Sequence, residues 1–157
     1  HNAEHSAGPK LAREWLESLG VNVDIISHVC EIIEYMAFKG ADVRTEMKTK
    51  EGMVVQDADR LDALGALGIA RTFTTGQQLG QEIYNPNIKP LRKAKQDEYK
   101  KQYTGERKNT TINHFYEKLL LLKDRMNTKT GKRIANRRHK FIELYLKQFF
   151  KEWEGKD

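Results

Sequence analysis

The chain has 157 residues, of which 38% are hydrophobic and 32% charged, and its formal net charge is +6. Its single cysteine, Cys30, excludes an intrachain disulfide and a cysteine-based zinc site, and no apolar run approaches the roughly 20 residues that cross a bilayer. The composition therefore predicts one soluble globular domain over residues 1–157, and the cysteine usage favours a reducing compartment, for which we expect the cytoplasm.

Apolar residues recur at helical spacing through most of the chain. The pattern predicts five main helices, near residues 9–19, 24–37, 54–72, 112–126 and 130–153, joined by irregular segments at residues 41–52 and 74–110. Gly65 and Gly68 fall inside the third helix, where glycine is unfavourable, so they are expected to mark close packing by another helix. We expect no sheet beyond a short hairpin, and the predicted fold class is all-α.

Three aspartates, Asp57, Asp59 and Asp62, lie in the predicted third helix among small and aliphatic residues. Asp59 and Asp62 share one helical stripe with Val55, which predicts that the Asp59 carboxylate faces the interior. A buried carboxylate normally pairs, takes up a proton or binds a metal. Two interpretations follow. Either Asp59 is a metal ligand, or Asp57 caps its helix, Asp62 is exposed and Asp59 meets a distant arginine.

The two parts of the chain carry opposite charge. Residues 1–90 contain 9 Lys and Arg against 13 Asp and Glu, whereas residues 91–157 contain 19 against 9. Such a division fits acidic metal ligands that face basic phosphate-binding groups across one cleft, a basic surface for nucleic acid, or two solvated faces that differ by chance. In the nucleic-acid interpretation, Tyr99, Tyr103 and the lysines around them are the candidate contacts.

Three segments carry a resemblance to a known family. The segment QDADRLDALG at residues 56–65 resembles the terminal aspartate motif of the HD-domain metal-dependent phosphohydrolases. The segments NTTINHFYEKL at residues 109–119 and RHKF at residues 138–141 resemble the C-terminal signature of one branch, the small hydrolases of the YedJ and YpgQ kind. The resemblance spans nearly the whole chain, and it implies an all-α, HD-domain-like helical bundle.

The resemblance also implies an activity. Enzymes of this family hydrolyse phosphoester or phosphoanhydride bonds with a divalent metal ion, for which Mn²⁺, Mg²⁺, Co²⁺ and Ni²⁺ are candidates. A phosphorylated small molecule, with a nucleotide as the favoured class, is the expected partner. Neither a membrane nor a nucleic acid is expected, and a homodimer is one candidate assembly.

In the family, a His, a His-Asp pair and a final Asp hold the metal. Asp59 matches the final Asp and Asp62 is its companion, so these two are the expected catalytic residues. His5 and His28 are further candidate metal ligands, although His5 also suits a plain loop and His28 can pair with Asp24 one turn earlier. The candidates for substrate binding are Lys39, Arg60, Lys118, Arg138 and His139.

The chain contains no His-Asp dipeptide. In the family, the first His and the His-Asp pair precede the region that resembles residues 5–20, so the resemblance implies an HD domain that is incomplete at its N-terminus. We expect the 157-residue chain to supply one metal ligand, to bind metal poorly and to show little or no turnover. The alternatives are a catalytically inactive HD-like structural or regulatory module and a basic helical nucleic-acid-binding module.

Overall fold

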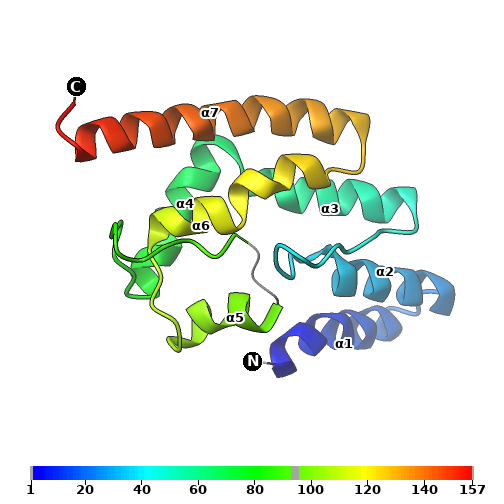
Figure 1. Ribbon diagram of the computed structural model, residues 1–157. Coiled ribbons are helices and arrows are strands. Elements are labelled where there is room, and N and C mark those ends of the chain that lie inside the picture. The colour runs from blue at the N-terminus through cyan, green and yellow to red at the C-terminus, as the bar shows by residue number, and fades with distance from the viewer. Residues whose placement is uncertain (1, 93–95, 157) are drawn as a thin grey trace.

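The computed structural model describes residues 2–92 and 96–156, without the side chains of residues 2–6 and 96. These residues form seven α-helices and one 3₁₀-helix (Figure 1). In chain order they are α1 (Asn2–Ser18), α2 (Val23–Met36), α3 (Lys50–Asp62), α4 (Gly65–Gln78), α5 (Gln96–Thr104), α6 (Thr111–Glu117), η1 (Leu119–Arg125) and α7 (Lys129–Trp153). No strand occurs in the described ranges, where the only β-bridge joins Glu82 to Thr110, and the all-α prediction is confirmed.

The predicted third helix is wrong, because residues 54–72 belong to two helices. Gly65 has a φ of +77°, a left-handed conformation that turns the chain between α3 and α4. A Cβ added at Gly68 would collide with the carbonyl of Ala63, so this glycine lets α4 begin close against the end of α3. Arg138 packs over Gly65 and donates from its guanidinium to the Leu61 carbonyl at 2.5 Å, which satisfies one of the last carbonyls of α3.

Two other predictions fail for local reasons. Residues 74–110 are not wholly irregular, because α4 continues to Gln78 and α5 is a short, polar helix with no clear apolar stripe. The predicted helix at 112–126 is interrupted at Lys118, whose φ and ψ of −137° and −63° separate α6 from η1. Thr110 caps α6 by accepting a hydrogen bond from the Asn113 amide at 3.2 Å.

The layers are clear in Figure 1, where α7 runs along one edge of the molecule, α3, α4 and α6 lie beneath it, and the α1–α2 hairpin lies farther away. The main core fills the space between α7, α4, α6 and η1. Its buried side chains are Leu64, Ile69, Ile112, Phe115, Leu119, Leu122, Met126, Ala135, Ile142 and Leu146. None of the helices in the described ranges is both long and apolar enough to span a membrane.

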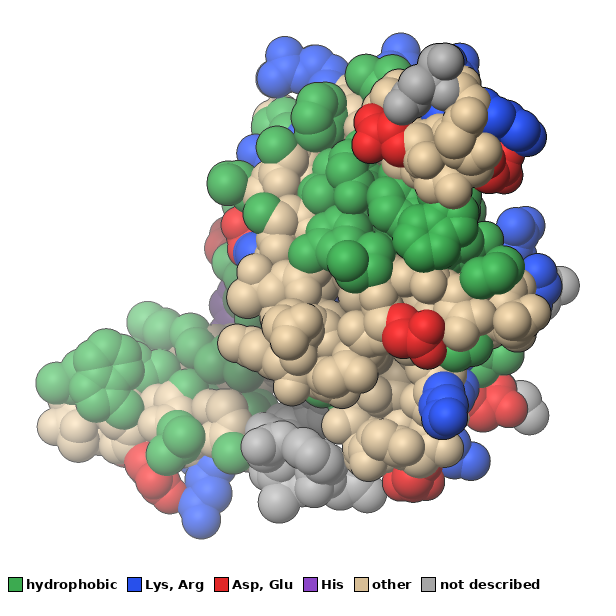
Figure 2. Space-filling view, turned by 90° about the vertical axis from the view of Figure 1, so that its left-hand side faces the viewer, with side chains coloured by type: hydrophobic (Ala, Val, Ile, Leu, Met, Phe, Trp, Pro, Cys, Tyr) green, Lys and Arg blue, Asp and Glu red, His purple; other side chains and the backbone are tan. Residues whose placement is uncertain are grey.

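Aromatic side chains join the C-terminal part of α7 to the segment after α4. The Tyr84 ring lies 5.2 Å from that of Phe150 and 5.1 Å from that of Trp153, both in edge-to-face geometry. Figure 2 shows hydrophobic side chains gathered at this end of the molecule. Trp153 nevertheless remains 53% exposed, and Phe141 on the same helix is 48% exposed.

Asp57 joins α3 to the beginning of α7. Its buried carboxylate accepts hydrogen bonds from the backbone amides of Asn127 and Thr128, at 2.7 and 2.8 Å, and from both of their side chains. Thr128 in turn caps α7 by accepting from the Gly131 amide at 2.9 Å. The expectation that Asp57 caps its own helix is therefore wrong, since Thr49 caps α3 and Asp57 supports the N-terminus of α7.

We predict that Asp57→Ala lowers the free energy of unfolding by about 3 kcal/mol, because it leaves the donors at residues 127 and 128 without their charged acceptor. Asp59→Ala also removes a carboxylate from α3, but from a position where the side chain is exposed. It should therefore change stability by less than about 0.5 kcal/mol. Urea unfolding followed by circular dichroism measures both values, and equal losses would contradict the role assigned to Asp57.

Candidate functional site

Asp59 lies on α3, and its side chain is exposed. The expectation that its carboxylate is buried is therefore wrong. The buried side chains of α3 are polar, with Gln56, Asp57 and Arg60 turned inward. Residues two apart on a helix point in different directions, so burial of Asp57 turns Asp59 away from the interior.

A pocket of about 130 Å³ opens between α4, α5 and α6. Its lining combines two cations with hydroxyl, amide and imidazole groups, which are the donors that bind phosphate oxygens. The polar lining residues are Arg71, Thr72, Thr75, Gln81, Gln102, Tyr103, Thr111, His114 and Lys118.

Lys118 connects this pocket to Asp59. Burial lowers the pKa of the Lys118 ammonium, while the nearby Asp59 carboxylate raises it and Arg71 lowers it further. Lys118 also lies 5.7 Å from the centre of the Phe38 ring, a cation–π contact. Lys118 thus lies within electrostatic range of the Asp59 carboxylate and of the Arg71 guanidinium.

His114 is the neutral member of the pocket. Burial, reinforced by the Lys118 charge, lowers its pKa from 6.5 to about 3. The ring stacks against Tyr99 with 6.4 Å between ring centres. Near pH 7 the imidazole is therefore uncharged and offers one donor and one acceptor.

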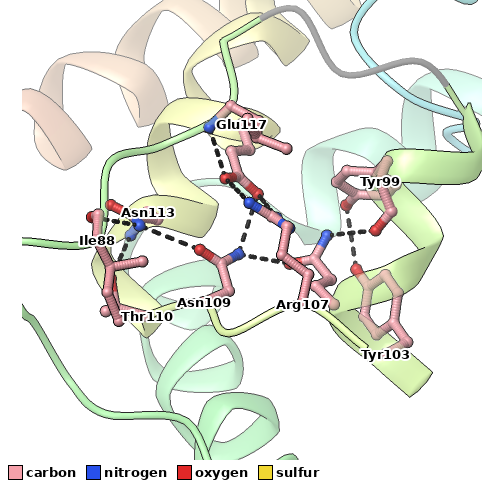
Figure 3. A network of polar contacts seen from close by, with 10 residues as sticks. Ile88, Tyr99, Tyr103, Arg107, Asn109, Thr110, Asn113 and Glu117 are labelled. Atoms are coloured by element: carbon pink, nitrogen blue, oxygen red, sulfur yellow. Dashed lines mark hydrogen bonds and ion pairs between the residues drawn. The ribbon is translucent and has the colours of Figure 1, made fainter. Parts of the chain in front are cut away.

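A buried polar network holds the α5 side of the pocket (Figure 3). At its centre, the fully buried Glu117 carboxylate pairs with Arg107 through two bonds of 3.0 and 2.8 Å. It also accepts from Asn109 at 3.0 Å and from the Leu91 amide at 2.8 Å. Asn109 donates in turn to Gln102, which lines the pocket.

The network binds three separate segments together. Asn113, on α6, donates to Asn109 at 3.1 Å and to the Ile88 carbonyl at 2.9 Å. On α5, the hydroxyl groups of Tyr99 and Tyr103 lie 3.1 Å apart (Figure 3). Burial of a carboxylate is costly unless its oxygens are fully hydrogen-bonded. The bonds to Glu117 therefore tie α5 and the segment before it to α6.

Two predicted phosphate contacts support helices instead. The buried Arg60 guanidinium donates to the Arg125 carbonyl and, at 3.4 Å, to Thr45, and burial lowers its pKa. Arg138 is engaged with the Leu61 carbonyl. Both guanidinium groups satisfy neutral protein acceptors outside the pocket lined by Lys118.

The remaining predicted residues are spread over the molecule. His28 hydrogen-bonds Thr49 at 2.8 Å rather than Asp24, and Lys39 lies 5.3 Å from the Tyr35 ring centre. His139 is buried on α7, 3.3 Å from Glu143. The side chain of His5 lies outside the described residues. Asp62 is exposed and forms an ion pair with Arg71.

Sequence reasoning overlooked several residues that shape the pocket. Arg71 carries no motif signal, and His114 was not among the candidate site residues. Their proximity to Lys118 depends on how α4 and α6 pack, which local spacing does not reveal. The sequence feature that could have indicated the buried network is the closely spaced set of polar residues Arg107, Asn109, Asn113 and Glu117.

Comparisons with known proteins were made for both sequence and structure. No family model matches the chain. It is 36% identical over 139 residues to the Bacillus subtilis protein YpgQ, an alignment that covers 88% of this chain and 58% of that protein. A solved structure from Lactobacillus plantarum has a TM-score of 0.79 and 38% identity, covering 89% of this chain and 64% of the other.

Two other solved structures are also similar to this chain. An HD-superfamily hydrolase from Bacillus thuringiensis has a TM-score of 0.66 and 42% identity, with coverage of 94% and 63%. Bacillus subtilis YpgQ in complex with ADP has a TM-score of 0.67 and 32% identity, with coverage of 95% and 66%. The chain therefore spans less than two thirds of the length of each relative, and its fold is an all-α, HD-like bundle.

The depressed pKa of His114 predicts a pH-dependent stability. The unfolded chain takes up a proton on this ring near pH 6.5, whereas the folded chain does so only near pH 3. Stability due to this group is therefore complete above pH 6.5 and falls with decreasing pH, by up to about 1.4 kcal/mol per unit.

We expect His114→Asn to lose this contribution. The difference in unfolding free energy between the unmodified chain and this variant should therefore change between about pH 7 and pH 5. Urea unfolding across this range measures the difference. Parallel pH profiles for the two proteins would show that His114 titrates normally in the folded state.

Proposed function

We propose that residues 1–157 form most of an HD-type metal-dependent phosphohydrolase domain of the YpgQ-like branch, incomplete at its N-terminus. Its substrates are nucleotides, cleaved at a phosphoester or phosphoanhydride bond. The observation that carries the proposal is the position of Asp59 in electrostatic range of Lys118, which lines a pocket with Arg71 and His114. Similarity to an HD-superfamily hydrolase and to YpgQ in complex with ADP supports it.

Asp59 is the residue of this chain that we assign to the metal. In the part of the chain that the structure describes, no three His, Cys, Asp or Glu side chains form a group that could hold an ion. The exposed Asp59 carboxylate offers an oxygen ligand suited to Mg²⁺, Mn²⁺, Co²⁺ or Ni²⁺. The other ligands are expected from the His and His-Asp motifs of the family. A bound ion would lower the pKa of a water molecule and polarise the phosphorus centre.

The other residues of the pocket would hold the substrate. Lys118 and Arg71 supply positive charge for the phosphate oxygens, and the ion pair with Asp62 positions the Arg71 guanidinium. Neutral His114 can hydrogen-bond the substrate without adding charge to it. The one cysteine is free and buried, in keeping with a cytoplasmic enzyme.

Asp59→Asn should abolish hydrolysis in a protein that joins this chain to the His and His-Asp motifs, because the neutral amide is a poor ligand for a divalent ion. Asp42→Asn is the matched control, since Asp42 is an exposed carboxylate in the loop before α3. Release of phosphate and pyrophosphate from nucleoside triphosphates, with Mn²⁺ and with EDTA, measures the activity. Turnover that survives both EDTA and Asp59→Asn would refute the proposal.

A further inference from the structure

The outward side of α7 carries a row of cations that the fold does not use. Seven exposed Lys and Arg side chains lie on the outward side of this helix, and we name them the α7 basic row. They are Lys129, Lys132, Arg133, Arg137, Lys140, Lys147 and Lys151. In Figure 1 no other element covers this edge of the molecule, and in Figure 2 Lys and Arg side chains project along the same upper edge.

The cations of the row form no ion pair with the rest of the described protein. Among the described residues, no carboxylate lies within ion-pair distance of any of the seven, and none of their side chains donates to another residue. The two acidic residues of α7 have other partners, because Glu143 contacts His139 and Glu152 accepts from Gln148. Ion pairs with described residues therefore do not neutralise the charge of the row.

This arrangement opposes helix stability. Lys129 and Arg133, Arg133 and Arg137, and Lys147 and Lys151 are like charges four residues apart, which repel on one helical face. The first turn of α7 begins at Lys129 and contains no acidic residue. Cations are unfavourable there because a helix N-terminus carries a partial positive charge. An anion bound along the helix would relieve both effects.

We propose that the α7 basic row binds the phosphate backbone of a nucleic acid. The row extends roughly 33 Å at 1.5 Å per residue, so a polyanion can meet most of the seven cations while a small anion can meet only one or two. A membrane surface fits less well, because a helix that lies in a bilayer inserts its apolar side, and the apolar side of α7 is packed in the core through Ala135, Ile142 and Leu146.

The positive surface continues past the N-terminal end of the row. Lys132 lines a pocket of about 260 Å³ together with Arg44, while Arg125, at the same pocket, donates to the carbonyls of residues 40, 41 and 43. The carboxylates at this pocket, Glu46 and Asp124, are exposed and form no ion pair with these cations in the described part of the chain. Lys132 and Arg44 therefore extend the positive surface beside the N-terminal end of α7.

The proposal goes beyond nucleotide hydrolysis and does not depend on it, since the row shares no residue with the pocket around Lys118. It also places the nucleic-acid surface on α7 rather than at Tyr99, Tyr103 and the lysines around them, which the sequence suggested. Tyr99 is only 5% exposed and stacks on His114, so it is not available to stack on a base.

Two variants of equal charge test the proposal. The first is Lys129→Gln, Arg133→Gln, Arg137→Gln and Lys140→Gln combined; the second combines Lys50→Gln, Lys89→Gln, Lys101→Gln and Lys108→Gln at exposed positions outside α7. Each set lowers the formal net charge from +6 to +2. Glutamine retains helix propensity, and circular dichroism verifies that all three proteins are folded.

Fluorescence anisotropy with a labelled duplex of about 20 base pairs measures binding at several salt concentrations. We expect the α7 variant to bind at least about tenfold more weakly than the unmodified chain, with a salt dependence smaller by about 3 in log–log slope, and the control variant to remain within about threefold. Equal weakening in both variants would overturn the proposal in favour of general charge attraction. Tighter binding to vesicles of phosphatidylserine and phosphatidylcholine than to the duplex would also overturn it.

Discussion

The buried carboxylate of Asp57 is the interaction on which the arrangement of the helices depends. It receives donors from Asn127 and Thr128, and those two residues form the turn from which α7 begins. A side chain at Gly131 would collide with this carboxylate, so the glycine permits the close contact. Because α7 supplies Ala135, Ile142 and Leu146 to the core, a polar contact determines where a large share of the apolar surface is buried.

The same contact orients α3 and therefore the candidate site. Gln56 extends the polar seam by donating to the Tyr35 carbonyl at 2.9 Å, and Arg60 extends it toward Arg125. With this side of α3 occupied, Asp59 is left at the surface, within electrostatic range of Lys118. A second buried carboxylate, Glu117, holds the segment between α5 and α6, and Asn109 of that segment donates to Gln102 of α5. Two buried acids thus fix the helices that carry Asp59 and the cations of the pocket.

The sequence was informative where a helix buries an apolar stripe. The predicted bounds of the second and last helices agree closely with those of α2 and α7. Both helices are amphipathic, and each buries its apolar side. Asp59 and Lys118 were both named from motifs, and they lie in electrostatic range of each other.

Prediction failed where polar residues are buried or where tertiary contacts decide. The spacing in α3 favoured the stripe containing Val55 and Asp59, yet both are exposed, because hydrogen bonds rather than apolar contacts fill the interior side of this helix. The left-handed conformation of Gly65 divides a segment that periodicity alone reads as one helix. Arg71 reaches the pocket only because α4 turns back at that glycine.

The central claim is that α3 separates two roles, with Asp57 holding the fold and Asp59 holding a metal. The most direct test is a crystal structure of this chain joined to the His and His-Asp motifs, grown with Mn²⁺ and a non-hydrolysable nucleotide, with the metal located by anomalous scattering. The account predicts an anomalous peak within coordination distance of the Asp59 carboxylate, phosphate oxygens directed toward Lys118, and an unchanged Asp57 contact to Thr128. A peak elsewhere, with Asp59 facing solvent, would contradict it.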